Sequence, residues 1–360
     1  MKKFRGTLRV KKNKLETQMP FEIGGVTIEP GTAKIVRIPI YMFPNQPGFN
    51  LNLRVIHGRH PGNRLFISST IHGDELNGIE TIRRVLASPR IKHIHGTLIT
   101  IPIVNMVGML MQSRYLPDRR DLNRSFPGSS TGSAASQLAY TLLTEVIEKC
   151  THGIDLHTGS NNRTNLPQIR CDFNSEEALK MALAFGAPVI LKANLRDGSL
   201  REAAGEIGIP TLLFEGGEAL RFNEKPIHSA TQGIFRVMTV LGMIHREKFV
   251  CIKESPIISP TSRWLRAPAT GIFRTMCNLG QKVLKGTVIG EITDPFGINV
   301  VDVVSSFDGI IIGQTQIPLV YKGDALFNVA WVVDPARAAV AIEEFEEEDL
   351  NLSLDDPTTY

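Results

Sequence analysis

The segment from Thr70 to Gly78 constrains the fold of this chain more than any other part of the sequence. It closes an apolar run, residues 65–71, and precedes a stretch in which apolar residues recur at helical spacing, residues 79–86. A strand followed directly by a tight turn and a helix is expected from this pattern. Such units are the building blocks of α/β proteins.

Two side chains in this turn, His72 and Glu75, are candidate metal ligands because they lie three residues apart and can face one point. Zinc binds nitrogen and oxygen ligands of this kind at roughly 2.0–2.2 Å. A polar turn without metal is the alternative. His157 ends another short apolar strand and is a candidate third ligand, or else a partly buried structural histidine. Since ligands bind at the carboxyl ends of strands in open α/β sheets, the three together favour a metal site with one position open for water.

Glu215 follows a third apolar strand, residues 209–214, and precedes a Gly-Gly pair. Beside a metal site, such a carboxylate can take a proton from water and give it to a leaving nitrogen. Without the two metal motifs, a solvated glutamate next to a turn would be the better interpretation. The sequence therefore makes Glu215 a candidate general base and acid.

A loop between the candidate ligands, residues 121–128, contains the pair Asn123 and Arg124. A guanidinium group binds a carboxylate in a fork geometry, so this pair suits recognition of a substrate carboxylate. The alternative is a solvent-facing basic loop. We expect Arg119 and Arg120 to face solvent in this way.

Taken in order, these residues resemble the succinylglutamate desuccinylase/aspartoacylase family of zinc carboxypeptidase-like hydrolases. The resemblance covers about 50–244 and rests on His72, Glu75, Arg114, Asp121, Asn123, Arg124, His157 and Glu215. It implies an α/β fold with a mixed sheet of the zinc carboxypeptidase type, flanked by helices. It also implies zinc-dependent deacylation of a small anionic N-acylated amino acid or related N-acylated amine.

The resemblance further implies a role for each residue. Its zinc ligands, for one zinc ion per chain, are His72, Glu75 and His157, and its substrate-binding residues are Asn123, Arg124 and, on looser spacing, Arg201. Glu215 would be the general base and acid for a zinc-activated water. Arg114 would stabilise the oxyanion, with Arg119 and Arg120 as rivals for that role. Asp121 would orient the first zinc histidine without binding the metal.

Changes in sequence pattern divide the chain into four expected parts. These are an N-terminal β appendage at 1–44, a catalytic domain at 45–250, a β module at 262–334 and an acidic tail at 335–360. We expect residues 51–57 and 65–71 to form a hairpin, and the tail to be mobile and solvated. The β module resembles a lipoyl- or biotinyl-like barrel-sandwich. It lacks the Met-Lys-type hairpin tip of carriers, so we expect a non-carrier module packed beside the active site and narrowing its mouth.

Composition excludes several classes of function. Hydrophobic residues make up 42% and charged residues 21% of the chain, as in soluble globular proteins. No apolar run approaches the ~20 residues that span a bilayer, and the basic N-terminus lacks the apolar core of a secretory signal. The four cysteines form no Cys-x-x-Cys pair, which favours reduced thiols in the cytoplasm.

Outside an acidic stretch at 343–356, bases outnumber acids, but few aromatic residues accompany them. This favours attraction of an anionic small molecule over nucleic-acid binding. We therefore expect no nucleic-acid or membrane partner, while a homo-oligomer stays possible. Two other functions stay open. One is a metallocarboxypeptidase, since a terminal carboxylate and an acylamino-acid carboxylate look alike to a guanidinium. The other is a non-catalytic binding protein that uses the β module.

Overall fold

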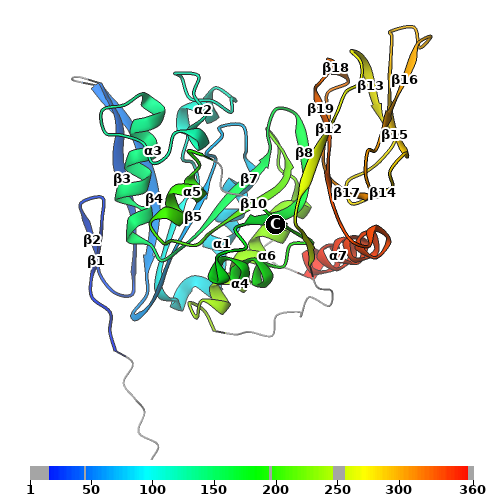
Figure 1. Ribbon diagram of the computed structural model, residues 1–360. Helices are drawn as coiled ribbons and strands as arrows, with labels where there is room; N and C mark the ends of the chain where they lie inside the picture. Colours follow the sequence, from blue (N-terminus) through cyan, green and yellow to red (C-terminus); the bar gives the residue numbers. More distant parts are fainter. Residues whose placement is uncertain (1–15, 44–45, 194–196, 246–255, 356–360) are drawn as a thin grey trace, which may run out of the picture.

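A 13-stranded mixed sheet extends across the computed structural model, which describes residues 16–43, 46–193, 197–245 and 256–355 (Figure 1). Its strands are β3 (Thr32–Phe43), β4 (Gln46–His57), β5 (His60–Ser69), β6 (His95–Ile101), β7 (His152–Gly159), β8 (Arg163–Cys171), β9 (Val189–Lys192), β10 (Thr211–Glu218), β11 (Ile257–Ser259), β12 (Ser262–Arg266), β14 (Lys282–Val283), β17 (Gly309–Thr315) and β19 (Ala325–Ala330). The main path runs β12-β19-β17-β8-β10-β7-β5-β6-β4-β3. Strands β6, β5, β7 and β10 are parallel, so their carboxyl ends lie at one edge of the sheet.

Helices cover both faces of this sheet, which confirms the predicted mixed α/β architecture. One face carries α1 (Asn77–Ala87), α4 (Glu176–Phe185) and α6 (Glu224–Val240), and the other carries α3 (Ala134–Glu145) and α5 (Leu200–Glu206). A short helix, α2 (Met106–Leu110), follows β6. Helices α4 and α5 begin directly after Ser175 and Ser199, which cap them by accepting hydrogen bonds from the backbone of the first turn.

The predicted hairpin between β4 and β5 is wrong. Strand β6 lies between them, antiparallel to β4 and parallel to β5. Its run of apolar residues suits an interior position, because Leu98 and Ile99 are buried on opposite faces of the sheet. Gly58 allows the close approach of β6, since a Cβ there would lie 2.0 Å from the Ile94 carbonyl oxygen.

The N-terminal residues that the structure describes, expected to form a β appendage to the catalytic domain, form a small hairpin and the edge strand of the large sheet. Strands β1 (Phe21–Ile23) and β2 (Val26–Ile28) form a small hairpin whose turn contains Gly24 and Gly25, both with positive φ. Ile23 and Ile28 are buried in the same hydrophobic core as α3. The next strand, β3, is the edge strand of the large sheet. Residues 1–15 of the expected appendage lie outside the described residues.

The C-terminal module is built on the edge of the same sheet. Four of its strands form a separate antiparallel sheet in the order β16-β15-β13-β18, with β13 (Gly271–Thr275), β15 (Val288–Thr293), β16 (Val300–Val304) and β18 (Leu319–Val320). This sheet packs on β12, β17 and β19 around a core that includes Phe273 and Phe327. Strand β17 also pairs with β8 of the catalytic part. The likeness to a barrel-sandwich stays a prediction.

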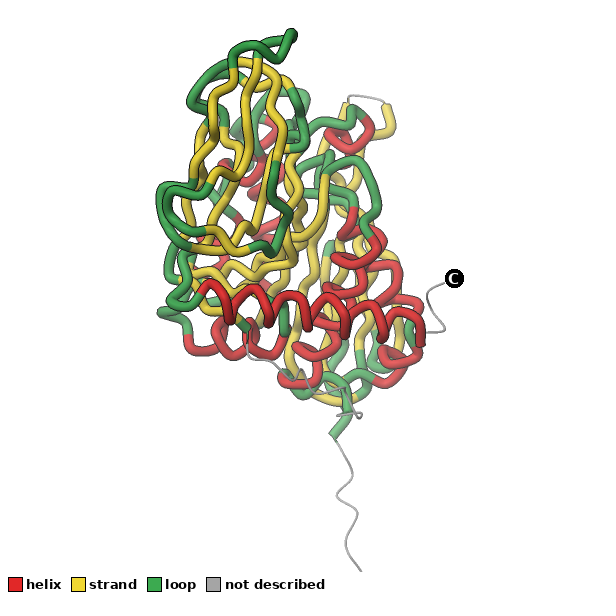
Figure 2. Tube along the Cα trace, turned by 90° about the vertical axis from the view of Figure 1, so that its right-hand side faces the viewer, coloured by secondary structure: helices red, strands yellow, loops and turns green. Residues whose placement is uncertain are grey.

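The expected mobile acidic tail differs from the structure, in which helix α7 (Pro335–Asp355) lies beneath the C-terminal module (Figure 2). Ala338 and Ile342 lie four residues apart on one face of this helix and are buried against the module and β9. This apolar pair packs the start of the helix against the rest of the protein. The prediction missed this contact because it rested on the acidic composition of the segment. Residues 356–360 lie outside the described residues.

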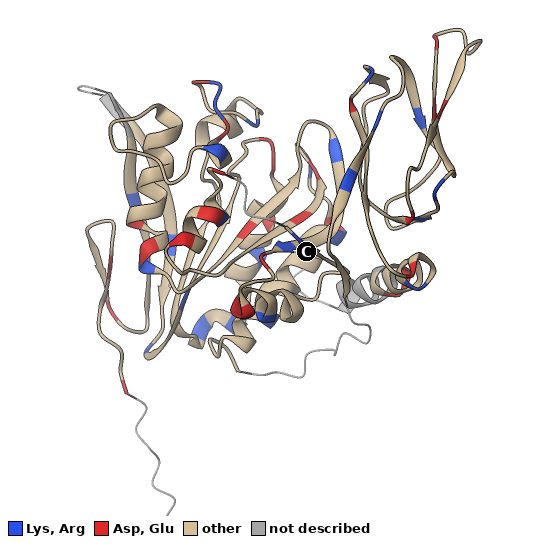
Figure 3. Cartoon of the chain, in the orientation of Figure 1, with Lys and Arg blue, Asp and Glu red and all other residues tan. Residues whose placement is uncertain are grey.

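Two global properties of the described residues bear on the predicted partners. No helix in this part of the chain is long and apolar enough to cross a membrane. Lysines and arginines are interspersed with acidic residues along the chain (Figure 3). A nucleic-acid-binding domain instead gathers its basic residues on one face or along one helix.

Candidate active site

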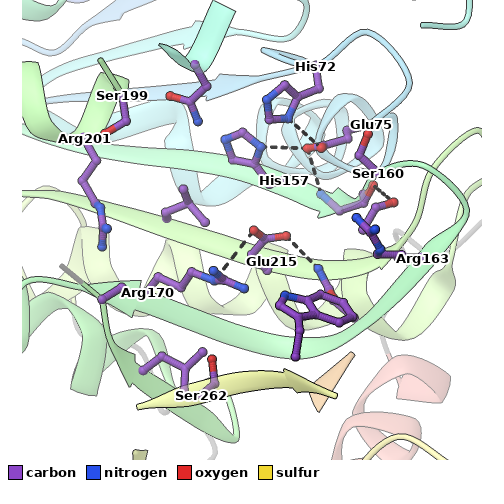
Figure 4. Close-up of a pocket in the computed structure, with 18 of the residues that line it drawn as sticks. His72, Glu75, His157, Ser160, Arg163, Arg170, Ser199, Arg201, Glu215 and Ser262 are labelled. Carbon is purple, nitrogen blue, oxygen red and sulfur yellow. Dashed lines mark hydrogen bonds and ion pairs between the residues drawn. The ribbon is translucent and has the colours of Figure 1, made fainter. Parts of the chain in front are cut away.

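The three motifs found in the sequence meet at the carboxyl ends of adjacent parallel strands. His72 follows β5, His157 lies near the end of β7, and Glu215 lies in β10, where it is the direct neighbour of His157. All three side chains line one cavity of about 610 Å³ (Figure 4). The predicted location at the strand ends is therefore correct.

A buried group of three residues at one end of the cavity could hold a metal ion. The Nδ1 atoms of His72 and His157 each lie 2.7 Å from a different oxygen of Glu75. One ligand atom from each residue lies within 4.8 Å of the others. The Thr158 backbone N–H also donates to Glu75, at 3.1 Å, and so fixes the orientation of the carboxylate. Two imidazole nitrogens and a carboxylate oxygen are a ligand set that zinc prefers.

Each histidine of this group contacts a second carboxylate through its other ring nitrogen. His157 Nε2 lies 2.7 Å from Asp155 Oδ2, and His72 Nε2 lies 3.2 Å from Asp121 Oδ1. The contact between His72 and Asp121 matches the predicted orienting role of that residue. Metal-binding histidines commonly use their other nitrogen in this way, so the arrangement fits a zinc ion. Asp155 was missed, although its spacing of two from His157 places both on one face of a strand.

Charge interactions within the group favour the charged form of each of its three residues. Burial opposes the charged form of His157, but the carboxylates of Asp155 and Glu75 outweigh it and raise its pKa well above the ordinary value. His72 behaves in the same way, with Glu75 and Asp121 raising its pKa against the effect of burial. Burial would likewise raise the pKa of Glu75, yet the two histidines lower it. Glu75 is therefore ionised at neutral pH, as a metal ligand must be.

Arg114 reaches the cavity beside this group. Its Nη2 and Nε atoms donate to Asp121 Oδ2 at 2.8 and 3.2 Å, and its Nη1 lies 3.6 Å from Glu75 Oε1. Burial would lower the pKa of Arg114, but Glu75 and Asp121 raise it. Its rivals Arg119 and Arg120 are exposed and do not line the cavity. Of the three candidates for this role, only Arg114 therefore lines the cavity.

The three predicted substrate-binding residues, Asn123, Arg124 and Arg201, line the same cavity. Asn123 Oδ1 accepts a hydrogen bond from the Leu200 backbone N–H at 2.9 Å, which leaves its Nδ2 as the group that can donate to a ligand. Arg201 is 8% exposed and follows the capping residue Ser199 in helix α5. Arg124 also lines the cavity. The loop around residue 123 and the start of helix α5 thus each contribute an arginine to the cavity lining.

Glu215 is held by strand β8. Asn165 Nδ2 donates to Glu215 Oε2 at 2.8 Å, and Arg170 Nε lies 3.8 Å from Glu215 Oε1 (Figure 4). The nearby Glu218 does not line the cavity, and its Oε1 lies 3.3 Å from Arg221 Nη2. Of the two carboxylates that flank the Gly-Gly pair, only Glu215 faces the metal-binding group.

Sequence reasoning missed several residues that line the cavity, among them Arg163, Asn165, Arg170, Lys192 and Trp264. Arg163 stacks on the ring of Trp264, with its guanidinium carbon 5.1 Å from the ring centroid. The polar run that follows His157 could have indicated Arg163 and Asn165, because a turn there returns the chain along the same sheet. No local signal indicates Trp264, which comes from the C-terminal module.

Positive charge dominates the lining. Six of the described lining residues are cationic, namely Arg114, Arg124, Arg163, Arg170, Lys192 and Arg201, whereas the acidic ones are Glu75 and Glu215. One of the acids belongs to the metal-binding group and the other lies beside Arg170. The remainder of the cavity therefore favours an anionic ligand.

Comparison with known proteins identifies the family. The model of the succinylglutamate desuccinylase/aspartoacylase catalytic domain matches residues 61–241, half of the chain. The chain belongs to this family. The matched range includes every residue that the sequence predicted for the site.

One relative of this chain is named as a deacetylase. N-alpha-acetyl-L-2,4-diaminobutyric acid deacetylase of Halomonas elongata is 27% identical over 297 residues, which cover 77% of this chain and 84% of the relative. Among solved structures, a succinylglutamate desuccinylase/aspartoacylase from Rhodobacter sphaeroides has a TM-score of 0.74 at 24% identity, with 84% and 95% of the two chains covered. The product-bound ectoine utilization protein EutE (DoeB) of Ruegeria pomeroyi has a TM-score of 0.75 at 21% identity, with 83% and 95% covered. At these sequence identities, the similarity to the two solved structures shows that the fold is shared.

Proposed function

We propose that this protein is a zinc-dependent amidohydrolase that removes the acyl group from a small N-acylated amino acid or related N-acylated amine. The observation that carries the proposal is the placement of His72, Glu75 and His157 across one cavity from Glu215. The family and the named deacetylase relative support the same reaction class.

Zinc, bound by His72, Glu75 and His157, would polarise the amide carbonyl and make water more acidic. Glu215 then removes a proton from the attacking water through its carboxylate and later delivers that proton to the leaving nitrogen. Arg114 donates hydrogen bonds to the oxygen that gains charge. Asp121 orients both Arg114 and His72, because it contacts each of them.

The residues that line the cavity favour a small anionic substrate. Asn123 and Arg124 can together hold a carboxylate, with the amide Nδ2 and the guanidinium as donors. Trp264 and the neighbouring residues of β12 line the cavity from the C-terminal module, which limits the length of chain that fits. The additional ammonium group of a diaminobutyrate substrate would face the surplus of cationic side chains. We therefore propose an amine portion that carries carboxylates and no further ammonium group.

Two measurements test this function. Metal analysis of protein purified without chelator should give about one zinc per chain, and removal of zinc should abolish a deacylase activity that added zinc restores. His72→Ala should lose zinc, because one of three protein ligands is gone. Less than half a zinc per chain, together with no rescue by zinc, would contradict the proposal.

A substrate panel addresses the alternative of a metallocarboxypeptidase. N-acetyl and N-succinyl derivatives of aspartate, glutamate, alanine and diaminobutyrate should be compared with dipeptides of the same residues. We expect the acidic derivatives to have the highest kcat/KM and diaminobutyrate the lowest. Faster cleavage of dipeptides would favour the carboxypeptidase, and binding of all compounds without turnover by the zinc-loaded protein would favour a non-catalytic binding protein.

The cysteines support a reducing compartment, and we propose the cytoplasm. Cys150, Cys171 and Cys277 are free and buried in the described part of the chain, while Cys251 lies outside it. Burial raises the pKa of the Cys150 thiol to about 12 and that of Cys171 to about 11. Such thiols are unreactive packing groups, as expected of structural cysteines in a reducing environment.

A further inference from the structure

The proposed general base depends on the position of one amide group. Asn165 Nδ2 donates to Glu215 Oε2 at 2.8 Å, whereas Arg170 Nε lies 3.8 Å from Oε1, too far for a hydrogen bond (Figure 4). Within the described residues, Asn165 therefore provides the side-chain hydrogen bond that orients Glu215. If the Asn165 amide were displaced, the Glu215 carboxylate would keep only its longer ion pair with Arg170.

Asn165 is enclosed by strands on both sides. In β10 it is paired with Gly217, and in β17 of the C-terminal module it is paired with Gly313. The residue is 7% exposed, so its side chain has little room to move. Because Oδ1 and Nδ2 belong to one planar amide group, whatever fixes Oδ1 also fixes the donor to Glu215.

Gly313 leaves the space that this amide occupies. A Cβ at Gly313 would lie 2.7 Å from Asn165 Oδ1, while the next nearest atoms, Asn328 Cβ and the Thr164 carbonyl oxygen, would lie at 3.4 and 3.5 Å. A methyl group there would therefore displace the amide and disturb little else. Gly313 also lies at a bulge, where β17 shifts register against β19. Bulges commonly redirect side chains next to active sites.

We propose that Gly313 of the C-terminal module is a positioning residue for catalysis: it admits the Asn165 amide, and Asn165 orients Glu215. The inference rests on the proposed function, because it assigns Glu215 the role of general base. It gives the module a part in the reaction through β17, in addition to the residues of β12 that line the cavity. Gly313 itself does not line the cavity.

The test compares Gly313→Ala, Asn165→Ala and the double variant in zinc-loaded protein, with the N-acyl amino acid that the wild type hydrolyses fastest. Each single variant should lower kcat about ten- to a hundredfold, as expected for loss of a hydrogen bond to a charged group, with KM and zinc content unchanged. The double variant should be no slower than Asn165→Ala. In a Glu215→Gln background, neither substitution should lower the residual kcat further.

Gly290→Ala is the matched control. Gly290 lies in β15 of the same module, in the sheet that does not pair with β8. A Cβ there would lie 2.8 Å from the Arg274 carbonyl oxygen, a backbone atom that cannot move aside as easily as a side chain. We expect it to lower the melting temperature while kcat stays at the wild-type value. Wild-type kcat in folded Gly313→Ala, or losses that multiply in the double variant, would overturn the inference.

An inactive wild type would count against the proposed function instead, and a crystal structure of Gly313→Ala would still decide the positioning. The distance from Asn165 Nδ2 to Glu215 Oε2 should then exceed about 3.5 Å, the limit of a hydrogen bond. An unchanged distance would overturn the inference independently of any activity.

Discussion

At the scale of single residues, the metal-binding group is built from side chains that each have at least two partners. Glu75 contacts both histidines, and Asp121 contacts both His72 and Arg114. Such shared contacts reduce the number of conformations that the buried side chains can adopt, so the group is organised before a metal or substrate arrives. Removal of one member should therefore disturb its neighbours, whereas a cavity residue that does not contact the group can be replaced without disturbing it.

Glu215 is such a residue, and its replacement gives the sharpest test of the chemistry. Glu215→Gln should keep the fold and the zinc content but lower kcat about 10²–10⁴-fold, because the amide can neither accept nor deliver the proton. Glu218→Gln is the control, since Glu218 pairs with Arg221 and lies outside the cavity. Metal analysis and steady-state kinetics of both variants check this. A slow Glu218→Gln beside a fast Glu215→Gln would identify the other carboxylate as the base.

At the scale of elements, ion pairs connect the helix that follows the metal turn to the longest helix on its face. Arg84 of α1 donates to Glu80 on its own helix at 2.8 Å and to Glu224 at the start of α6, also at 2.8 Å. Hydrogen bonds from Arg83 and Arg84 lower the pKa of Glu80, and the hydrogen bond from Arg84 lowers the pKa of Glu224. The connection therefore depends on both carboxylates being ionised.

These pKa shifts predict a pH-dependent contribution to stability. A carboxylate with a lowered pKa in the folded state stabilises the protein above its unfolded pKa, near 4.5, and loses that effect as the pH falls through the folded value. Glu224→Gln should thus lower the melting temperature at pH 7 by about 1–2 °C, a small effect because half-exposed ion pairs contribute below about 1 kcal/mol. The difference from wild type should shrink and then vanish as the pH falls below 4.5, through the lowered pKa of Glu224 in the folded protein. Glu206→Gln, at an exposed position of α5, should change neither value.

At the scale of the whole molecule, the charge of the cavity differs from that of the chain. The chain has a net charge of only +4, while cationic side chains strongly outnumber acidic ones in the cavity lining. A concave site lined by one sign of charge raises the local concentration of oppositely charged ligands. We therefore expect association with the substrate to depend on ionic strength.

This expectation can be measured as a salt dependence. For a dianionic N-acyl amino acid, kcat/KM should fall several-fold between about 20 and 200 mM salt, because screening shortens the reach of the cavity charges. The neutral amide of the same compound should show little change, and this comparison controls for effects of salt on the enzyme. Equal salt dependence of the two compounds would contradict electrostatic attraction by the cavity.

The sequence predicted the parts of the site that depend on local pattern. Apolar runs located the strand ends that carry His72, His157 and Glu215. It failed where partners are distant in the sequence. The insertion of β6 between β4 and β5, and the contact of Arg163 with Trp264, depend on which strands pair. Pairing follows from burial in the whole sheet, which short-range periodicity does not record.

Strand β8 connects two parts of the molecule, since β10 borders it on one side, while β17 and β9 share the other. A gene truncated before the C-terminal module would consequently expose the backbone donors and acceptors at the start of β8, residues 163–165, to any strand that meets them, which invites aggregation. Shuffling this module between relatives would likewise require exchanging β8 together with it. For protein engineering, the module and the catalytic strand β8 should therefore be kept together as one unit.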